Sequence, residues 1–412
     1  NQASIDSNCV CREGDTPGDY VQWNPKELAY LNDWNVIYVK DGFDFKQIVA
    51  AQRYASALNN GQPTAIVYRT TKGWKYGIEG KASHGAGHAF CSEGYLNVMK
   101  TLFDNPGELM PWCTNPEEIQ SGSKNKAIVE SWFWKTLLLF RKQIQQNGEL
   151  TSMLGDRLLS SKNSLLEKNI KIVEKSGSSE KIYDLAKKDM EIPNELKLEL
   201  GSSSTLREQL GNVLNYYNVN SDGAIVGASA DLLGSTSVSK LVGGMTEGFY
   251  NADSNPDARL LSLGGICEDA MAGILAGIST YGSHIGAGSS YGAFIAPLAH
   301  IAARLHAIGN QSRQELKKES YNPFIVICAH AGIKTGEDGP THADPQPLQL
   351  LQENFAGDTM VTLTPWDPQE IWYLMKESFK IRPAVIAPFV TRPKEKIFDR
   401  EAMGLAPASE AA

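Results

Sequence analysis

Residues 324–342 read Phe-Ile-Val-Ile-Cys-Ala-His-Ala-Gly-Ile-Lys-Thr-Gly-Glu-Asp-Gly-Pro-Thr-His, an apolar run followed by a polar, glycine-rich loop. The apolar run Phe324–Cys328 predicts a buried strand, because it is short, continuous and rich in β-branched residues. The loop carries two histidines, a glutamate and an aspartate. In open parallel sheets, ligands bind outside the carboxyl ends of the strands. This loop is therefore a candidate site at such an edge.

Outward from this stretch, apolar runs alternate with helical patterns from about Ser203 onward, which predicts a parallel α/β sheet with crossover helices. The further strands expected here are Ala224–Val226, Arg259–Leu263, Met360–Leu363 and Ala384–Ala387. The helices expected here are Glu268–Thr280, Tyr291–Ile308, Gln346–Asn354 and Asp367–Ser378.

The beginning of the chain shows the same alternation. Trp34–Val39 and Thr64–Tyr68 predict strands on either side of a helix over Asp44–Asn60, and a Gly/His-rich loop follows at Gly80–Gly87. Between the two α/β blocks, residues 127–202 are rich in Lys, Glu, Leu and Ser and predict a helical linker. The fold class is therefore α/β with two parallel-sheet modules.

The composition is that of a globular protein, with 42% hydrophobic and 21% charged residues in a chain of 412. A net charge of -8 argues against nucleic acid as a partner. Membrane insertion is not expected either, because no apolar run reaches the roughly 18 residues of a spanning helix. The six cysteines form no disulfide framework, and we expect reduced thiols. Cys9 and Cys11 lack a second pair at zinc-site spacing.

Four groups of residues could carry chemistry, and the weakest signal among them is the pair of histidines in the Gly-rich loop Ser83–His88. Glu268 opens an apolar, small-residue helix, where it could exchange a proton with a buried ligand nitrogen or simply complement the helix dipole. His330 and His342 match no zinc spacing, so a substrate-contacting acid/base loop is favoured over a metal site. Tyr291 and Phe294 lie three positions apart in the sequence, so on a helix they would share one face. They could belong to the core or stack against a cofactor.

Together these residues resemble the transketolase family. The run Gly336–His342 is similar to the family's Gly-Glu-Asp-Gly-Pro-Thr-His signature without a mismatch. Ser229–Leu232 resembles its Ser-Ala-Asp-Leu turn, and the segment around Arg207 resembles its arginine-bearing helix. The resemblance implies a diphosphate-binding half-domain at 1–126, the linker, a pyrimidine-binding domain at 203–393 and the start of a C-terminal segment at 394–412.

The resemblance also implies an activity and its cofactors. The expected reaction is transfer of a two-carbon ketol unit from a ketose to an aldose phosphate in the pentose phosphate pathway, with thiamine diphosphate and Mg²⁺. The expected substrates are sugar phosphates. The chain is expected to form a homodimer or to pair with a complementary chain, and its expected location is the cytoplasm. The alternatives are a related carboligase or 2-oxoacid enzyme and a non-catalytic fragment or subunit.

The residue roles carry over position by position. Glu268 would protonate the aminopyrimidine ring, and Tyr291 and Phe294 would line its pocket. The predicted substrate and metal contacts are His84 and His330 for sugar hydroxyls and proton movement, Asp338 and His342 near the reacting carbon, Arg207 and Ser235 for the acceptor phosphate, and Asn1 and Ala3 for Mg²⁺.

Some positions depart from the family pattern. Cys267 and Asp269 flank Glu268 where the family has arginine and histidine or phenylalanine, and Phe389 replaces a phosphate-binding Ser-Arg pair, with Arg392 nearby. These changes affect the expected specificity for phosphorylated sugars. The family's Gly-Asp-Gly turn would precede Asn1, and this predicts a fragment or one subunit of a split enzyme.

Overall fold

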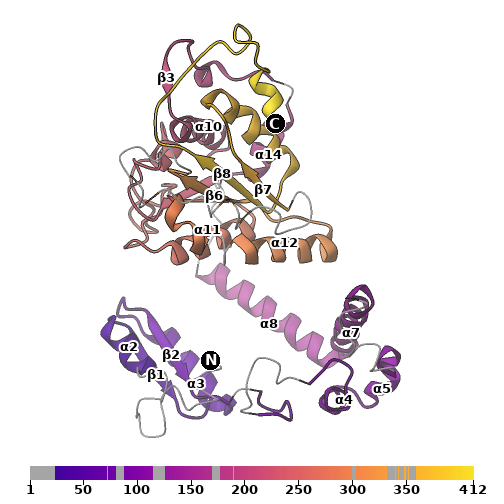
Figure 1. Ribbon diagram of the computed structural model, residues 1–412. Coiled ribbons are helices and arrows are strands. Elements are labelled where there is room, and N and C mark those ends of the chain that lie inside the picture. The colour runs from indigo at the N-terminus through magenta and orange to yellow at the C-terminus, as the bar shows by residue number, and fades with distance from the viewer. Residues whose placement is uncertain are drawn as a thin grey trace. The chain divides into compact units, whose positions relative to one another are not determined.

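The computed structural model describes residues 24–71, 73–79, 88–114, 126–168, 177–188, 190–298, 303–331 and 359–412, together with Gly339, His342, Leu348 and Leu351 (Figure 1). The chain divides into two compact units, Asn1–Ile170 and Lys171–Ala412. Each unit is treated by itself below. In the described part of the chain, no helix combines the length and the apolar character needed to cross a membrane.

The first unit begins with the predicted strand–helix–strand motif. Helix α2 (Pro25–Leu31) precedes strand β1 (Asn35–Val39), helix α3 (Phe45–Ala57) and strand β2 (Thr64–Tyr68). The two strands pair in parallel, with Asn35 opposite Thr64. The side chain of Asp44 caps α3 by accepting a hydrogen bond from the backbone N–H of Lys46. Both predicted strands and the helix between them are confirmed.

A small helical core follows in the same unit. Its elements are α4 (Glu93–Met99), α5 (Pro106–Leu109), η1 (Pro111–Thr114), α7 (Lys126–Gln146) and α8 (Gly148–Glu167). A disulfide joins Cys91 to Cys113, and both cysteines are buried with Met99, Phe103 and Met110. The expectation of reduced thiols is therefore wrong for this pair. Cys9 and Cys11 lie outside the described residues.

The second unit is built on a five-stranded parallel sheet in the order β4-β5-β6-β8-β7 (Figure 1). Its strands are β4 (Ile225–Ser229), β5 (Ile285–Tyr291), β6 (Phe324–Ala329), β7 (Met360–Leu363) and β8 (Val385–Val390). The predicted α/β class with a parallel sheet is confirmed. Four of the strands lie where the apolar runs predicted them.

The fifth strand, β5, was not predicted, because its sequence Ile-Gly-Ala-Gly-Ser-Ser-Tyr lacks a continuous apolar run. The strand lies so close to the preceding helix that a Cβ atom on Gly286 would stand 2.1 Å from the carbonyl oxygen of Leu275. Only glycine fits at such a distance. The sequence signal was therefore weakened by the same feature that lets the strand pack.

Two other expectations are wrong in detail. The predicted helix Tyr291–Ile308 does not start at Tyr291, which ends β5; a turn, η4 (Gly292–Phe294), follows, and helix α12 spans Arg304–Lys317. Arg259–Leu263 forms no strand: Leu260 makes only isolated bridges, to Gly227 and Phe249. The predicted helix Gln346–Asn354 falls almost entirely outside the described residues.

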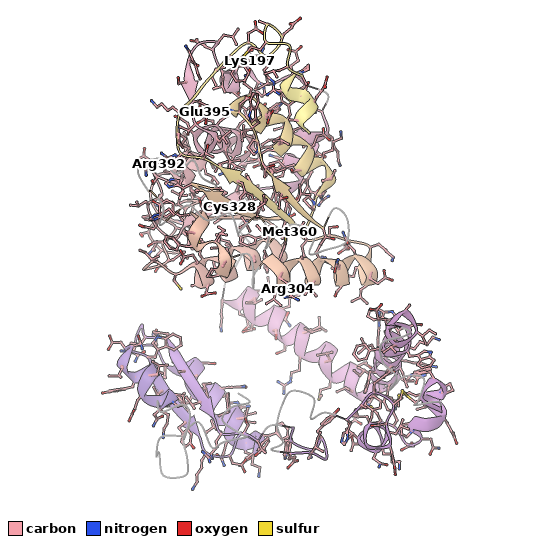
Figure 2. The ribbon with its side chains drawn as sticks, in the orientation of Figure 1. Lys197, Arg304, Cys328, Met360, Arg392 and Glu395 are labelled. Atoms are coloured by element: carbon pink, nitrogen blue, oxygen red, sulfur yellow. A yellow bond between two sulfur atoms is a disulfide. The ribbon has the colours of Figure 1, made fainter. Side chains whose placement is uncertain are left out.

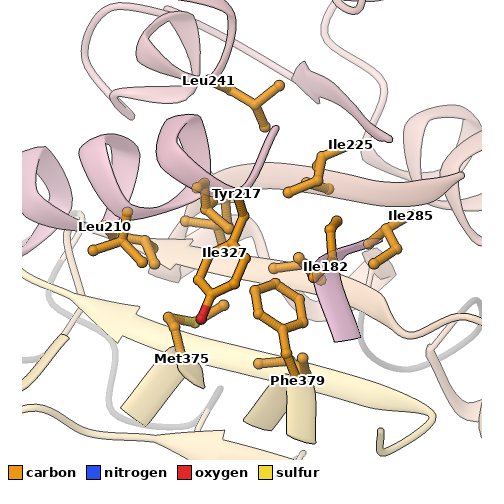
Figure 3. Packing of buried hydrophobic residues seen from close by; sticks show 14 of the residues in the cluster. Ile182, Leu210, Tyr217, Ile225, Leu241, Ile285, Ile327, Met375 and Phe379 are labelled. Atoms are coloured by element: carbon orange, nitrogen blue, oxygen red, sulfur yellow. The ribbon is translucent and has the colours of Figure 1, made fainter. Parts of the chain in front are cut away.

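Helices cover both faces of the sheet. On one face lie α9 (Ser179–Lys187), α10 (Leu206–Asn220) and α14 (Ile371–Ile381), and on the other lie α11 (Glu268–Tyr281) and α12. The side chains of β6 alternate, with Ile325 and Ile327 in the first core and Val326 and Cys328 in the second. In the first core, Tyr217 of α10 lies against Phe379 of α14, with ring centroids 4.8 Å apart (Figure 3).

Short elements complete the second unit. They are η2 (Asn194–Leu196), β3 (Ser203–Ser204), η3 (Val238–Val242), η7 (Pro368–Glu370), β9 (Glu395–Lys396) and η8 (Ala408–Ala411). Strand β9 pairs antiparallel with β3, and the backbone of Ile397 bonds Gly201 and Ser202. Residues 395–397 therefore fold back onto the region of β3, whereas η8 lies against α14 and η7.

Candidate functional site

Polar and aromatic side chains gather at the carboxyl ends of three neighbouring strands. Strand β4 leads into the turn that holds Ser235, β5 ends at Tyr291, and His330 follows directly after β6. Cys328, two residues earlier in β6, lies within the sheet (Figure 2). Burial raises the pKa of the Cys328 thiol, which keeps it protonated and unreactive. The site therefore occupies the edge of the sheet where the sequence predicted it.

Arg207, Ser235 and His330 form a compact hydrogen-bonded group. Arg207 lies in the first turn of α10, which Thr205 caps by accepting from the backbone N–H of Glu208. Nη1 of Arg207 donates to the carbonyl oxygen of Ser235 and lies 3.4 Å from its hydroxyl and 2.7 Å from Nε2 of His330. Three predicted site residues from separate parts of the chain are thus brought together.

The turn that carries Ser235 is held by its own hydroxyl groups. The hydroxyl of Ser229 donates to the carbonyl oxygen of Asp231 at 2.5 Å. The hydroxyl of Thr236 in turn donates to the oxygen of Ser229 at 3.1 Å. These bonds fix the Ser-Ala-Asp-Leu turn at the end of β4, so the carbonyl group of Ser235 has a defined direction toward α10.

Four rings form the next layer of the site. The Tyr291 ring lies 4.3 Å from that of His330 and 5.5 Å from that of His342, centroid to centroid. Phe294 lies 6.4 Å from Tyr291 and 5.5 Å from His342. Tyr291 is 7% exposed whereas Phe294 is 46% exposed, so Phe294 offers an open aromatic surface. The two aromatics are neighbours through a strand end and a turn, not through a shared helix face.

Glu268 is the first residue of α11, and its carboxylate accepts a hydrogen bond from the hydroxyl of Ser290 at 3.0 Å. Ser290 is the residue before Tyr291 in β5, so this bond ties the carboxylate to the strand end that also carries Tyr291. Ser290 was missed by the sequence analysis. The available signal was a pair of serines closing a glycine-rich run just before the singled-out tyrosine.

The remaining predicted residues are not tested by this geometry. His84, Asp338, Asn1 and Ala3 lie outside the described residues. Phe389 of β8 is half-buried against the second core, and Arg392 follows that strand (Figure 2). Within the described ranges, no three His, Cys, Asp or Glu side chains gather as a metal site.

The arrangement offers two chemical capabilities. A partly buried carboxylate suits an aromatic nitrogen base, because it can hold or exchange a proton with a ring nitrogen, and the exposed ring of Phe294 offers an aromatic surface. The guanidinium of Arg207 near the Ser235 hydroxyl suits an anionic oxygen ligand such as a phosphate. Glu268 lies on α11 and Arg207 on α10, and their hydrogen bonds tie them to the end of β5 and to the turn after β4.

Comparison with known proteins gives the same picture. Residues 203–392 match the family described as the transketolase pyrimidine-binding domain. The chain is 25% identical over 389 residues to a transketolase of Bacillus subtilis, covering 90% of this chain and 49% of the relative. It is 27% identical over 377 residues to a transketolase of Staphylococcus aureus, with the same coverage.

Solved structures show the same fold. A transketolase from Pichia stipitis in complex with sedoheptulose 7-phosphate superposes with a TM-score of 0.55 at 21% identity, covering 96% of this chain and 51% of that one. A transketolase from Campylobacter jejuni gives a TM-score of 0.54 at 21% identity, covering 96% and 52%. The chain thus spans about half the length of the relatives it matches.

Proposed function

Residues 203–392 match the transketolase pyrimidine-binding domain, and from this match we propose that the chain belongs to the transketolase family and takes part in ketol transfer. The proposed reaction moves a two-carbon ketol unit reversibly from a ketose to an aldose phosphate. The observation that carries the proposal is the hydrogen bond from Ser290 to Glu268 at the end of β5, the strand that also carries Tyr291. A related 2-oxoacid enzyme is not favoured, because the relatives found are transketolases.

The described residues fit the pyrimidine end of thiamine diphosphate. An aminopyrimidine needs a carboxylate that can share a proton with its ring nitrogen and an aromatic surface to lie against. Glu268 supplies the first and Phe294 the second, with Tyr291 behind it. When bound, thiamine diphosphate supplies the carbon nucleophile of the reaction.

The chain's own residues then have distinct proposed roles. Glu268 holds and returns the proton at the pyrimidine nitrogen, and Ser290 orients its carboxylate. Arg207 and Ser235 bind the phosphate group of the sugar, and His330 and His342 contact its polar groups. On the family resemblance alone, we propose that His84 and Asp338 also contact the substrate. On the same ground, Asn1 and Ala3 are proposed as Mg²⁺ ligands.

We also propose an assembly and domain boundaries. The outer face of α11 exposes Gly273, Ile274, Gly277 and Tyr281, which supports a homodimer or a complementary chain covering this helix. The segment 1–126 would be the second half of a diphosphate-binding domain, 127–202 a linker, 203–393 the pyrimidine-binding domain and 394–412 the start of a C-terminal segment.

The proposed location is the cytoplasm, and the proposed pathway is pentose phosphate interconversion. The Cys91–Cys113 disulfide is unusual for a cytoplasmic protein, since thiols are kept reduced there. Sugar phosphates remain the proposed substrates, because a solved relative carries sedoheptulose 7-phosphate.

The decisive test is Glu268→Ala in the whole natural protein, assayed for ketol transfer from a ketose to an aldose phosphate. Loss of a proton-transferring group lowers such rates by about 10²- to 10⁴-fold, and we expect a loss in this range. Glu315→Ala is the matched control, because Glu315 is an exposed carboxylate on α12 that pairs with the exposed Lys318. Full activity of Glu268→Ala would contradict the proposal.

A further inference from the structure

We propose that Ser279 is a positioning residue for Glu268, which lies at the opposite end of the same helix. The relevance of this to catalysis rests on the function proposed above. The hydroxyl of Ser279 fixes where α11 lies along β5. The place of the helix along that strand then decides whether the carboxylate of Glu268 meets the hydroxyl of Ser290.

The hydroxyl of Ser279 lies between the amino ends of two neighbouring strands. Ser279 belongs to the last turn of α11 and is fully buried. Its oxygen accepts from the backbone N–H of Gly286 at 2.8 Å, and its proton goes to the carbonyl oxygen of Pro323 at 2.9 Å. The ladder between β5 and β6 begins just after this point, with Ala287 opposite Ile325. The helix therefore cannot slide along β5 without breaking both bonds.

One face of β5 sets the height of the helix above the strand. Residues 286, 288 and 290 share this face, because side chains alternate along a strand. A Cβ atom on Gly286 would stand 2.1 Å from the carbonyl oxygen of Leu275, and one on Gly288 would stand 3.1 Å from the side chain of Leu275. Of the three residues only Ser290 has a side chain, and its hydroxyl donates to Glu268. Helix and strand thus pack closely up to the carboxylate.

The two ends of α11 move together. Ser279 and Glu268 are about 16 Å apart along the axis of a regular helix. Between them Met271 and Leu275 are fully buried in the core, so the helix shifts as one body. The bond from Ser290 to Glu268 is 3.0 Å long, which is the upper end of the usual range for hydroxyl donors. An axial shift of about 0.5 Å therefore weakens it.

Ser221 offers a counterpart with the same bonding at another place. It is fully buried at the end of α10. Its hydroxyl donates to the carbonyl oxygen of Asn218 at 3.1 Å and accepts from the backbone N–H of Ala224 at 3.3 Å. Loss of either serine hydroxyl leaves buried backbone groups without this partner, so both alanine variants should lose stability. Only Ser279→Ala should change the surroundings of Glu268.

The experiment is a ¹³C spectrum, at constant pH, of the whole protein labelled at the side-chain carboxyl carbon of glutamate. Glu268→Gln assigns the signal of Glu268, and Ser290→Ala shows where this signal lies once the hydrogen bond is lost. We expect Ser279→Ala to move the signal in the same direction as Ser290→Ala, and Ser221→Ala to leave it at the wild-type position. If Ser279→Ala does not fold, Ser279→Cys replaces it, because a thiol fills the same space but bonds more weakly.

A Glu268 signal that stays at the wild-type position in the folded Ser279 variant would overturn the proposal, as would an equal movement in Ser221→Ala. This measurement needs neither cofactor nor turnover. It can therefore fail while ketol transfer is confirmed, or succeed while ketol transfer is not found.

A rate measurement adds a second test where ketol transfer is found. If Ser279 acts through the bond from Ser290 to Glu268, it has nothing left to position once that bond is removed. Ser279→Ala alone should then lower the rate, whereas Ser279→Ala combined with Ser290→Ala should match Ser290→Ala within about twofold. Losses that multiply in the double variant would contradict this route of action.

Discussion

The hydroxyl of Ser290 donates to Oε1 of Glu268 across 3.0 Å, joining the end of a buried strand to the first turn of a helix. Ser290 is 2% exposed, so the bond is shielded from water on the strand side. We expect Ser290→Ala to lower ketol transfer by about 10- to 100-fold, because a hydrogen bond to a charged group contributes about 1.5–3 kcal/mol and each 1.4 kcal/mol is about tenfold in rate. The rate should be measured at saturating substrate and cofactor in the whole protein.

The control for this prediction is the preceding residue of the same strand. The hydroxyl of Ser289 donates to the carbonyl oxygen of Ile327 at 3.3 Å inside the sheet, whereas it is Ser290 that donates to Glu268. Ser289→Ala should cost stability while leaving the rate close to that of the wild type. An equal loss of rate in both variants would assign the effect to the strand as a whole.

Gly286→Ala tests the close approach of β5 and α11. The added Cβ would meet the carbonyl oxygen of Leu275 at 2.1 Å, and backbone atoms cannot move aside as a flexible side chain can. We expect a loss of about 3 kcal/mol or more in the free energy of unfolding, at the upper end for an overpacked core. Gly288→Ala, whose Cβ would meet side-chain atoms of Leu275 at 3.1 Å, should cost less. Urea unfolding of both variants measures the difference.

These two features also mark where prediction from the sequence stops. Phe324–Cys328 was found as a strand because its apolar run needs no knowledge of its neighbours. Strand β5 was missed because its glycines Gly286 and Gly288 break up the apolar run. Their role is clear only from the folded chain, in which both lie against Leu275 of α11. A tertiary contact of this kind overrides the local preference of the residues.

The site divides in the same manner. Glu268, Arg207 and His330 could be predicted because they belong to motifs with a defined spacing. Ser290 belongs to no such motif, and the bond from Arg207 to His330 joins residues 123 positions apart. The Cys91–Cys113 pairing is also a property of the folded chain, because composition alone favoured reduced thiols.

The disulfide gives a prediction for the first unit. Its cysteines are separated by 22 residues, and a cross-link of that span removes about 3 kcal/mol of chain entropy from the unfolded state. We expect a reducing agent to lower the unfolding midpoint of this unit while leaving the second unit unchanged. Mass spectrometry under non-reducing conditions should show the pair oxidised. Cys91→Ala with Cys113→Ala should be insensitive to the reducing agent.

Arg400 gives a prediction for the second unit. Its Nη1 donates to Glu370 at 2.8 Å and to Asp367, and the three side chains are 12%, 8% and 5% exposed. Arg400→Met leaves two nearly buried carboxylates without their cation, which should cost about 3–5 kcal/mol of unfolding free energy. The exposed pair of Lys380 and Glu377 is the control, since Lys380→Met should change stability by less than about 1 kcal/mol. Equal losses of stability in the two variants would show that water solvates the carboxylates of Asp367 and Glu370 once the cation is removed.

His306 predicts a dependence of stability on pH. Its Nε2 donates to the carbonyl oxygen of Asn322 at 2.9 Å, which leaves Nδ1 as the acceptor facing Thr280 at 3.1 Å. Burial lowers the pKa of His306 below its ordinary value of 6.5, although the bond to Asn322 acts in the opposite direction. The ring is therefore neutral in the folded protein at a pH where it is already charged in the unfolded chain.

The sign follows from that difference. Above pH 6.5 the ring is neutral in both states and contributes nothing to the pH dependence. As the pH falls below 6.5, the unfolded chain binds a proton that the folded protein does not, so stability falls by up to about 1.4 kcal/mol per pH unit. His306→Gln keeps a donor for Asn322 but cannot titrate. Urea midpoints at pH 7.5 and 5.5 should fall less in this variant than in the wild type, and equal falls would remove His306 as the cause.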